Sequence, residues 1–142
     1  GAAGAFDPAA EPVAEAVRAA TGGRGADVVL VCPGDAAAVR AGLEAAAPGG
    51  RVVCFTPLPP DQPLVVDQTA LYFREVVLAH SYSCGPDETR EALRLLVEGA
   101  VEVESLVTHR AGLEGVGAAL ERARGKGAGL KTVIYPGAAG PG

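Results

Sequence analysis

The 142-residue sequence is poor in several residue types, and each shortage narrows the class of protein. It contains no methionine and no tryptophan, aromatic residues make up 4% of it, and the net charge is −5. The sequence has no cluster of basic residues and no aromatic-rich stretch that could bind the phosphates and bases of a nucleic acid, so we expect no nucleic-acid partner. No apolar run approaches the roughly 20 residues that cross a bilayer, so we expect no membrane insertion. Because the chain starts at Gly1 and lacks methionine, we expect a piece of a longer polypeptide.

Cysteine and histidine, the usual zinc ligands, are scarce as well. The three cysteines, Cys32, Cys54 and Cys84, are odd in number and widely spaced, which favours reduced thiols in the cytoplasm over disulfides. No pair has zinc-ligand spacing, so we expect neither metal ligands nor catalytic residues. Cys32 and Cys54 end apolar runs and are expected to be buried, whereas Cys84 follows in a loop. For His80 and His109 we expect polar packing.

Apolar runs rich in β-branched residues alternate with helical patterns in the first half of the chain. Such runs are typical of strands buried on both faces of a parallel sheet. Four prolines between residues 56 and 63 predict a loop, and residues 4–7 are expected to end a short strand. The expected strands cover residues 28–32, 52–55 and 76–80, and the expected helices cover residues 11–20, 36–47 and 67–73. A strand, a helix and a second strand in succession predict parallel strands with a right-handed connection.

The second half of the chain is predicted to hold two more helices and a final strand. One helix begins at Asp87 and Glu88, whose carboxylates suit the positive end of the helix dipole, and Gly99 ends it. The other covers residues 113–123. A flexible turn at 125–129 leads to a strand over 131–135, and residues 136–142 are expected to form a disordered tail. The inward-facing residues of the two helices are predicted to be Ala92, Leu93, Leu96 and Val97, then Val116, Ala119, Leu120 and Ala123.

Seven short phrases follow one another along the chain: Thr21 to Val29, Pro48 to Val53, Arg74-Glu75, Ser81 to Ser83, Leu95 to Gly99, Leu106 to His109 and Leu130 to Ile134. In this order they resemble the medium-chain zinc alcohol dehydrogenases, and the resemblance covers nearly all of residues 4 to 136. The stretch from Leu71 to Thr108 is most similar to the polyol (sorbitol-like) and threonine dehydrogenase branch.

The resemblance implies an α/β fold, a partial Rossmann domain whose doubly wound parallel sheet lacks its first strands. Residues 1–85 would form this nucleotide-binding part. Residues 86–135 would continue the cofactor domain and return, as C-terminal helices and a strand, to the catalytic domain, followed by the tail at 136–142. The glycine-rich phosphate turn and the zinc ligands of the family would precede Gly1.

The function implied by the resemblance is oxidation of a small alcohol, of the polyol or secondary type. The cofactor would be NAD or NADP, zinc would be present in the parent enzyme, and this chain alone is expected to be inactive. Two alternatives remain open at this point. The parent is a zinc-free quinone or enoyl reductase, or the chain is a truncated, non-enzymatic module that binds a protein partner.

Candidate cofactor contacts follow from the rule that ligands lie beyond the carboxyl ends of parallel strands. By resemblance, the first strand end borders the adenosine side, and the next two present backbone groups to the nicotinamide carboxamide. Lys131 falls where the family often places a basic residue that reaches the pyrophosphate. The expected contacts are Cys32, Pro33, Gly34, Phe55, Thr56, Ala79, Ser81 and Lys131.

Both edges of the predicted sheet are expected to be available for pairing with another chain. Residues Val28–Cys32 would present an unpaired apolar edge, which invites aggregation or pairing with another chain. At the other edge, Val76–His80 is the last strand. By resemblance this edge pairs with its twofold mate, so we expect a homo-oligomer.

Overall fold

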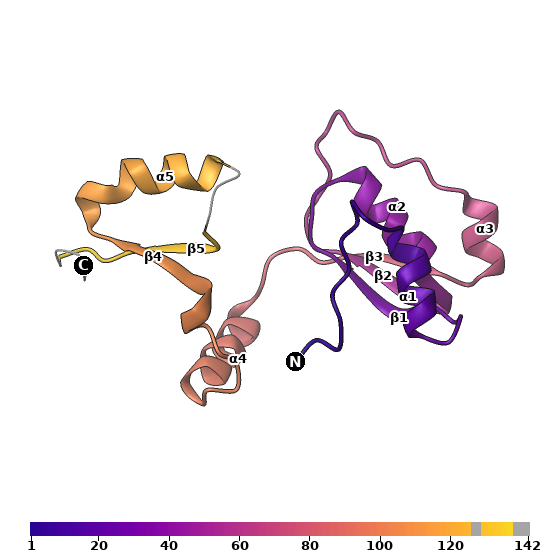
Figure 1. Ribbon diagram of the computed structural model, residues 1–142, viewed down its shortest axis with the longest axis horizontal. Helices are drawn as coiled ribbons and strands as arrows, with labels where there is room; N and C mark the ends of the chain where they lie inside the picture. The colour runs from indigo at the N-terminus through magenta and orange to yellow at the C-terminus, as the bar shows by residue number, and fades with distance from the viewer. Residues whose placement is uncertain (126–128, 138–142) are drawn as a thin grey trace. The chain divides into compact units, whose positions relative to one another are not determined.

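The computed structural model describes residues 1–125 and 129–137, and the chain divides into two compact units. The first unit is Gly1–Ser83 and the second is Cys84–Gly142 (Figure 1). Both are built from parallel strands and helices, so the predicted α/β class is confirmed.

The first unit contains a three-stranded parallel sheet and three helices. Its sheet has the order β1-β2-β3, and every pair of neighbours is parallel. Apart from the short strand expected to end at residues 4–7, the predicted strands and helices of this half are found at the expected places, with shifts at their ends. The elements in chain order are α1 (Val13–Ala20), β1 (Ala26–Val31), α2 (Ala36–Ala45), β2 (Ala46–Cys54), α3 (Gln68–Phe73) and β3 (Val77–His80).

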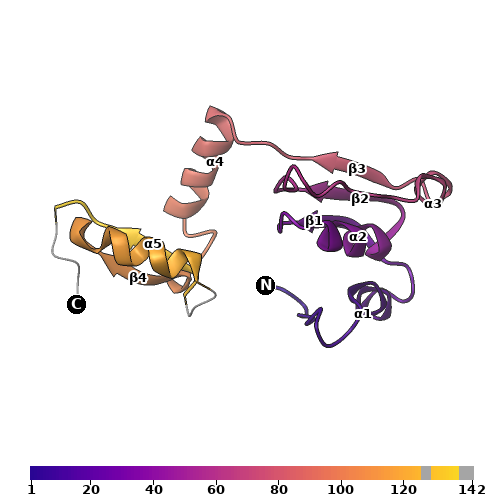
Figure 2. The same cartoon turned by 90° about the horizontal axis from the view of Figure 1, so that it is seen from above.

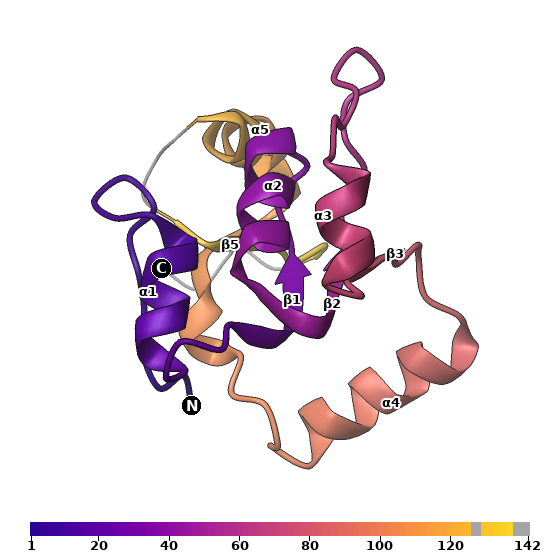
Figure 3. The same cartoon turned by 90° about the vertical axis from the view of Figure 1, so that its right-hand side faces the viewer.

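The core of the first unit lies between the sheet and α2, with α1 and α3 flanking α2 (Figure 3). Val39 and Leu43 of α2 contact the side chains that β1 and β2 turn toward them, and Val52 is fully buried. Removing such side chains from water contributes about 25 cal/mol for each Å² of apolar surface. The buried cluster consists of Val31, Val39, Leu43, Ala46, Val52 and Cys54.

The opposite face of this sheet is exposed. Val28, Arg51 and Val77 lie in one register row across the three strands, and 61% of Val28 and 43% of Val77 are exposed. Leu30 of β1 is 68% exposed. Among the described residues no strand pairs with the outer side of β1, which confirms the prediction that this apolar strand forms an edge (Figure 2).

The junction of α2 and β2 differs from the prediction. The helix ends at Ala45 instead of residue 47, and residues 48–50, which lie between the predicted helix and the predicted strand, belong to β2. Ala46 pairs with Ala26 of β1, and the register then shifts before Arg51. Gly49 has a φ of 73°, a conformation that glycine adopts without steric cost, and this lets the strand pass through the irregular stretch.

Two further predictions for the first unit are wrong. Residues 4–7 form no strand and are exposed, because a strand needs a partner for its backbone groups and none of β1 to β3 pairs with this segment. Cys32 is exposed rather than buried, because β1 ends at Val31 on the edge of the sheet. Cys54 is buried and Cys84 is exposed, as expected.

The second unit contains two parallel strands joined by a helix. Its elements are α4 (Pro86–Val97), a short 3₁₀ turn, β4 (Val107–Ala111), a second 3₁₀ turn, α5 (Val116–Arg124) and β5 (Lys131–Ile134). Strand β4 pairs in parallel with β5. This strand was not predicted, whereas α4, α5 and β5 were. Gly99, with a φ of 67°, ends α4 as predicted.

The predicted inward faces of the two helices are only partly buried. No residue of α4 is buried, and 79% of Val97 is exposed, so the stripe from Ala92 to Val97 is not a core in this structure. In α5, Ala119 is buried, but Leu120 is 57% exposed. A unit with two strands and one covering helix has too little surface to enclose both stripes. The predicted turn at 125–129 and the predicted tail at 136–142 lie largely outside the described residues.

Candidate functional site

The carboxyl ends of the three parallel strands of the first unit meet at one edge of the sheet. Each exit is linked to its neighbour by a backbone hydrogen bond. The amide of Phe55 donates to the Val31 carbonyl at 2.9 Å, and the amide of Ser81 donates to the Cys54 carbonyl at 3.0 Å. The structure therefore brings together seven of the eight predicted contacts: Cys32, Pro33, Gly34, Phe55, Thr56, Ala79 and Ser81.

The exits of β1 and β2 touch one another at Gly34. A Cβ atom built on this glycine would lie 2.6 Å from the Pro57 carbonyl oxygen and 2.9 Å from Cγ2 of Thr56. Such distances are shorter than packed atoms tolerate, so any side chain here would push the two loops apart. Gly34 thus fixes how closely the two strand exits approach.

This edge of the sheet is exposed, and helix α2 begins directly after the exit of β1. Cys32, Phe55, Thr56 and Ser81 are exposed, so a ligand can reach this edge, although the amides of Phe55 and Ser81 are already bonded to the neighbouring strand. Directly after Gly34, the side chain of Asp35 accepts a hydrogen bond from the Ala38 amide at 3.1 Å and caps α2. The arrangement suits a ligand held by backbone groups at strand ends.

A cavity of about 340 Å³ opens on the same edge of the sheet. Its polar lining comes from Cys54, Thr56, Gln62 and His80, and its apolar lining includes Val39. Cys54 and His80 are register partners at the ends of β2 and β3. Sequence reasoning set both aside as packing residues, although their places at the ends of neighbouring strands were a signal that they share one site.

The chemistry of this cavity is that of binding rather than nucleophilic attack. Burial raises the pKa of the Cys54 thiol, so the thiol stays protonated near neutral pH, and a protonated thiol is a poor nucleophile.

Lys131, the eighth predicted contact, belongs to the second unit. It opens β5, and its backbone bonds with the Thr108 hydroxyl, which accepts from its amide at 3.3 Å and donates to its carbonyl at 3.2 Å. Its side chain is exposed and lines a cavity of about 330 Å³ beside α5. The other seven predicted contacts belong to the first unit.

The residues that the structure describes form no group of three or more histidine, cysteine, aspartate or glutamate side chains able to hold a metal ion. They thus do not fit a zinc ion. Of the three free cysteines, two are exposed and one is buried. A search of the same residues finds no helix long and apolar enough to cross a membrane.

Comparison with known proteins identifies relatives for most of the chain. A family described as zinc-binding dehydrogenase matches residues 1–98. An L-threonine 3-dehydrogenase from Symbiobacterium thermophilum is 36% identical over 134 residues, which are 92% of this chain and 37% of the relative. An L-threonine 3-dehydrogenase from Bacillus licheniformis is 33% identical over 84% of this chain and 34% of its own length.

Solved structures agree in fold. A provisionally named zinc-binding dehydrogenase from Sinorhizobium meliloti 1021, solved with NADP bound, superposes with a TM-score of 0.84 at 28% identity over 96% of this chain and 40% of its own. The alcohol dehydrogenase TADH from Thermus sp. ATN1 superposes with a TM-score of 0.80 at 26% identity over 92% of this chain and 37% of its own.

The chain spans a little over one third of the length of the relatives it matches. Because the family match covers residues 1–98 of 142, the chain belongs to the zinc-binding dehydrogenase family, as a part corresponding to the C-terminal portion of its members.

Proposed function

We propose that this chain forms one wall of the nicotinamide-cofactor site of an alcohol dehydrogenase. The observation that carries the proposal is the meeting of three parallel strand exits at one open edge, joined by the Phe55–Val31 and Ser81–Cys54 backbone bonds. Ligands of doubly wound sheets lie beyond the carboxyl ends of the strands. Family membership favours a nicotinamide cofactor over other ligands.

The cofactor is NAD or NADP, and the three strand exits divide its parts among them. Cys32, Pro33 and Gly34 border the adenosine side. Phe55, Thr56, Ala79 and Ser81 present backbone donors and acceptors to the nicotinamide carboxamide, and Lys131 supplies a point charge for the pyrophosphate. The NADP bound to the S. meliloti relative supports this class of cofactor.

The reaction proposed for the whole protein is hydride transfer from a small alcohol, of the polyol or secondary type, to the nicotinamide ring. The threonine dehydrogenase names of two relatives support this substrate class. Zinc belongs to the proposed whole enzyme, but its ligands would lie outside the described residues, so the chain alone is expected to be inactive. The three unpaired thiols favour a cytoplasmic compartment.

The alternatives of a zinc-free reductase and of a non-enzymatic module are less well supported. The matched family is described by zinc binding and dehydrogenase activity, and the two relatives above are both named as dehydrogenases. Oxidation of a panel of secondary alcohols, polyols and L-threonine by the complete gene product, with and without a chelator, separates the three possibilities.

Cofactor binding tests the site directly. The complete gene product should quench or shift NADH or NADPH fluorescence with a Kd in the micromolar range. Gly34→Ala should raise that Kd at least tenfold. The added Cβ would lie 2.6 Å from the Pro57 carbonyl oxygen and would therefore push the Pro57 loop away. Gly117→Ala is the matched control, since a Cβ there meets nothing within 4 Å. A folded protein that binds neither dinucleotide would end the proposal.

A further inference from the structure

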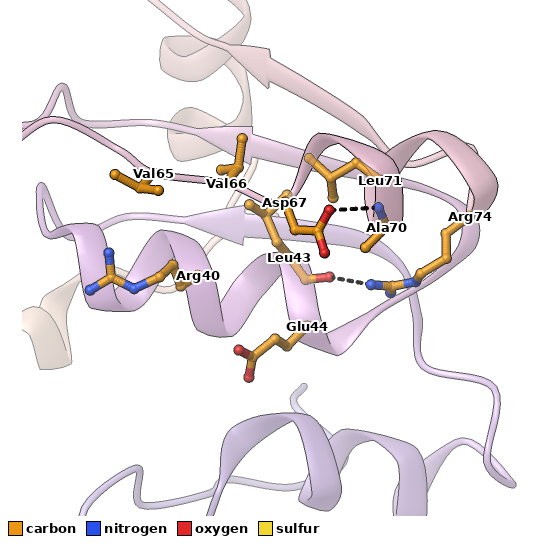
Figure 4. Close-up of a pocket in the computed structure, with 9 residues that line it drawn as sticks. All are labelled: Arg40, Leu43, Glu44, Val65, Val66, Asp67, Ala70, Leu71 and Arg74. Atoms are coloured by element: carbon orange, nitrogen blue, oxygen red, sulfur yellow. Dashed lines mark hydrogen bonds between the residues drawn. The ribbon is translucent and has the colours of Figure 1, made fainter.

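Arg74 joins the turn between α3 and β3 to the end of α2. Its guanidinium group donates to the Leu43 carbonyl at 3.2 Å (Figure 4) and also to the Ala46 carbonyl. Its own backbone carbonyl accepts from the Gly49 amide at 2.8 Å. Three bonds thus connect one residue of this turn with the last turn of α2 and the start of β2.

The turn that Arg74 anchors holds a backbone conformation that its residues do not favour. Glu75 has a φ of 54°, a left-handed conformation that is unfavourable for a residue with a Cβ atom. The Glu75 amide donates to Tyr72 and the Val76 amide to Leu71, both at 3.1 Å, which completes a Schellman-type helix end. A non-glycine residue persists in this conformation when surrounding contacts hold it, and Arg74 supplies those contacts.

Strand β3 begins two residues after this turn and is short. It has four residues, lies at the edge of the sheet and pairs only with β2 among the described strands. Its register runs from Val77 opposite Arg51 to His80 opposite Cys54. Because a slip by one residue reverses every side chain of a strand, the turn at its start sets which backbone groups reach its far end.

We propose that Arg74 is a positioning residue of the cofactor site: by clamping the α3–β3 turn to the α2–β2 junction, it fixes the register of β3 and thereby places Ala79 and Ser81. The inference rests on the proposed cofactor role of these two residues. Arg74 touches no proposed cofactor contact itself. It acts through the strand, from the end opposite to the site.

The structure supplies two matched controls for Arg74. Arg40 lines the same cavity of about 160 Å³ beside α2 and α3 but makes no hydrogen bond or ion pair with the described residues (Figure 4). Arg18 binds the same helix end, donating to the Glu44 carbonyl at 2.9 Å, but it comes from α1 and not from the turn before β3. Loss of Arg18 therefore loosens α2 without releasing β3.

The experiment compares Arg74→Gln, Arg74→Lys, Arg18→Gln and Arg40→Gln in the complete gene product. Hydrogen–deuterium exchange of peptides covering residues 76–83 reports on the Ser81–Cys54 bond, and fluorescence titration gives the Kd for NADH or NADPH. We expect Arg74→Gln to speed exchange of this segment and to raise the Kd, each about tenfold. Arg74→Lys, which keeps one donor group, should have a smaller effect on the exchange rate and on the Kd. Arg40→Gln should change neither the exchange rate nor the Kd.

The outcomes separate this inference from the proposed function. Unchanged exchange at residues 76–83 in a folded Arg74→Gln variant would overturn the inference, and so would an equal effect of Arg18→Gln. An unchanged Kd with faster exchange would also overturn it, because register would then not govern the site. If the wild-type protein binds no dinucleotide, the proposed function fails, and with it the role of Arg74 toward a cofactor, whereas exchange still shows whether Arg74 fixes β3.

Discussion

At the scale of single residues, Glu75 occupies a position where the backbone suits glycine. The left-handed conformation costs about 1–2 kcal/mol for a residue with a Cβ atom, and Glu75 has a φ of 54°. We expect Glu75→Gly to raise the free energy of unfolding by about 1 kcal/mol in urea denaturation. Glu75→Ala, which keeps the Cβ atom, is the control and should leave stability nearly unchanged. Equal stability of the glycine and alanine variants would show that the turn carries no strain.

The three thiols should differ in reactivity according to their surroundings. Cys32 and Cys84 are exposed and Cys54 is buried, and burial raises the pKa of Cys54 above its ordinary value of 9.0. With a thiol-reactive chromogen at pH 8, we expect two fast equivalents and one slow equivalent. A Cys54→Ser variant should lose the slow equivalent alone.

The same shift gives a pH dependence of stability with a defined sign. The folded protein holds the Cys54 proton more tightly than the unfolded chain, so this contribution to stability is complete below pH 9.0. It is lost as the pH rises through the folded pKa. The stability of the wild type should therefore fall above pH 9 more steeply than that of Cys54→Ser, measured by urea denaturation across pH 8 to 10.5.

At the scale of elements, two glycines in helices are predicted to respond to alanine in opposite directions. A Cβ atom on Gly42 of α2 would lie 2.9 Å from Cγ2 of Val31 and 3.3 Å from Cγ1 of Val29. Overpacking of this kind costs about 1–3 kcal/mol, so Gly42→Ala should destabilise the protein. Gly117 of α5 has open space instead, and Gly117→Ala should stabilise it by about 0.5 kcal/mol. Chemical denaturation of both variants checks the pair, and a stabilising Gly42→Ala would contradict the observed helix-to-sheet contact.

The elements also show how far a sequence determines this fold. Strands β1, β2 and β3 were predictable because their apolar runs are continuous, and those of β1 and β2 lie between glycine and proline residues. Strand β4 was missed, although its residues Val107, His109 and Ala111 alternate in burial with Thr108 and Arg110. A histidine at a half-buried position hid this alternation. The extension of β2 over Ala46 to Gly50 was not predictable, because it depends on carbonyl groups held by arginines distant in sequence.

Some features of the candidate site were likewise predictable from the sequence, and others were not. The strand exits followed from topology alone, since parallel strands bring their carboxyl ends to one edge. The close approach of Gly34 to Thr56 and Pro57, and the shared cavity of Cys54, Gln62 and His80, depend on loop paths that residue patterns do not encode. The roles of the eight proposed contacts remain predictions.

At the scale of the whole molecule, the β3 edge is the proposed site of association between copies. Its strand has free backbone groups on the outer side within the described residues, and Val77 is 43% exposed. We expect Val77→Pro to convert the proposed oligomer of the complete gene product to smaller species in sedimentation velocity, because a proline distorts the short strand whose outer edge would pair with the other copy. Val65→Pro, at an exposed loop position, is the control. An oligomer that is unchanged by Val77→Pro would place the contact elsewhere.

The open face of the first sheet has one further consequence, which concerns Arg51. Its Cα lies in register between Val28 of β1 and Val77 of β3. A positively charged side chain therefore lies at the centre of an otherwise apolar surface. Any polypeptide laid over that surface must bring a carboxylate or a carbonyl to meet the guanidinium, since a desolvated and unmatched charge costs several kcal/mol. Arg51 therefore favours an acidic or carbonyl-bearing segment over a purely aliphatic one as the neighbour that covers this side of the sheet.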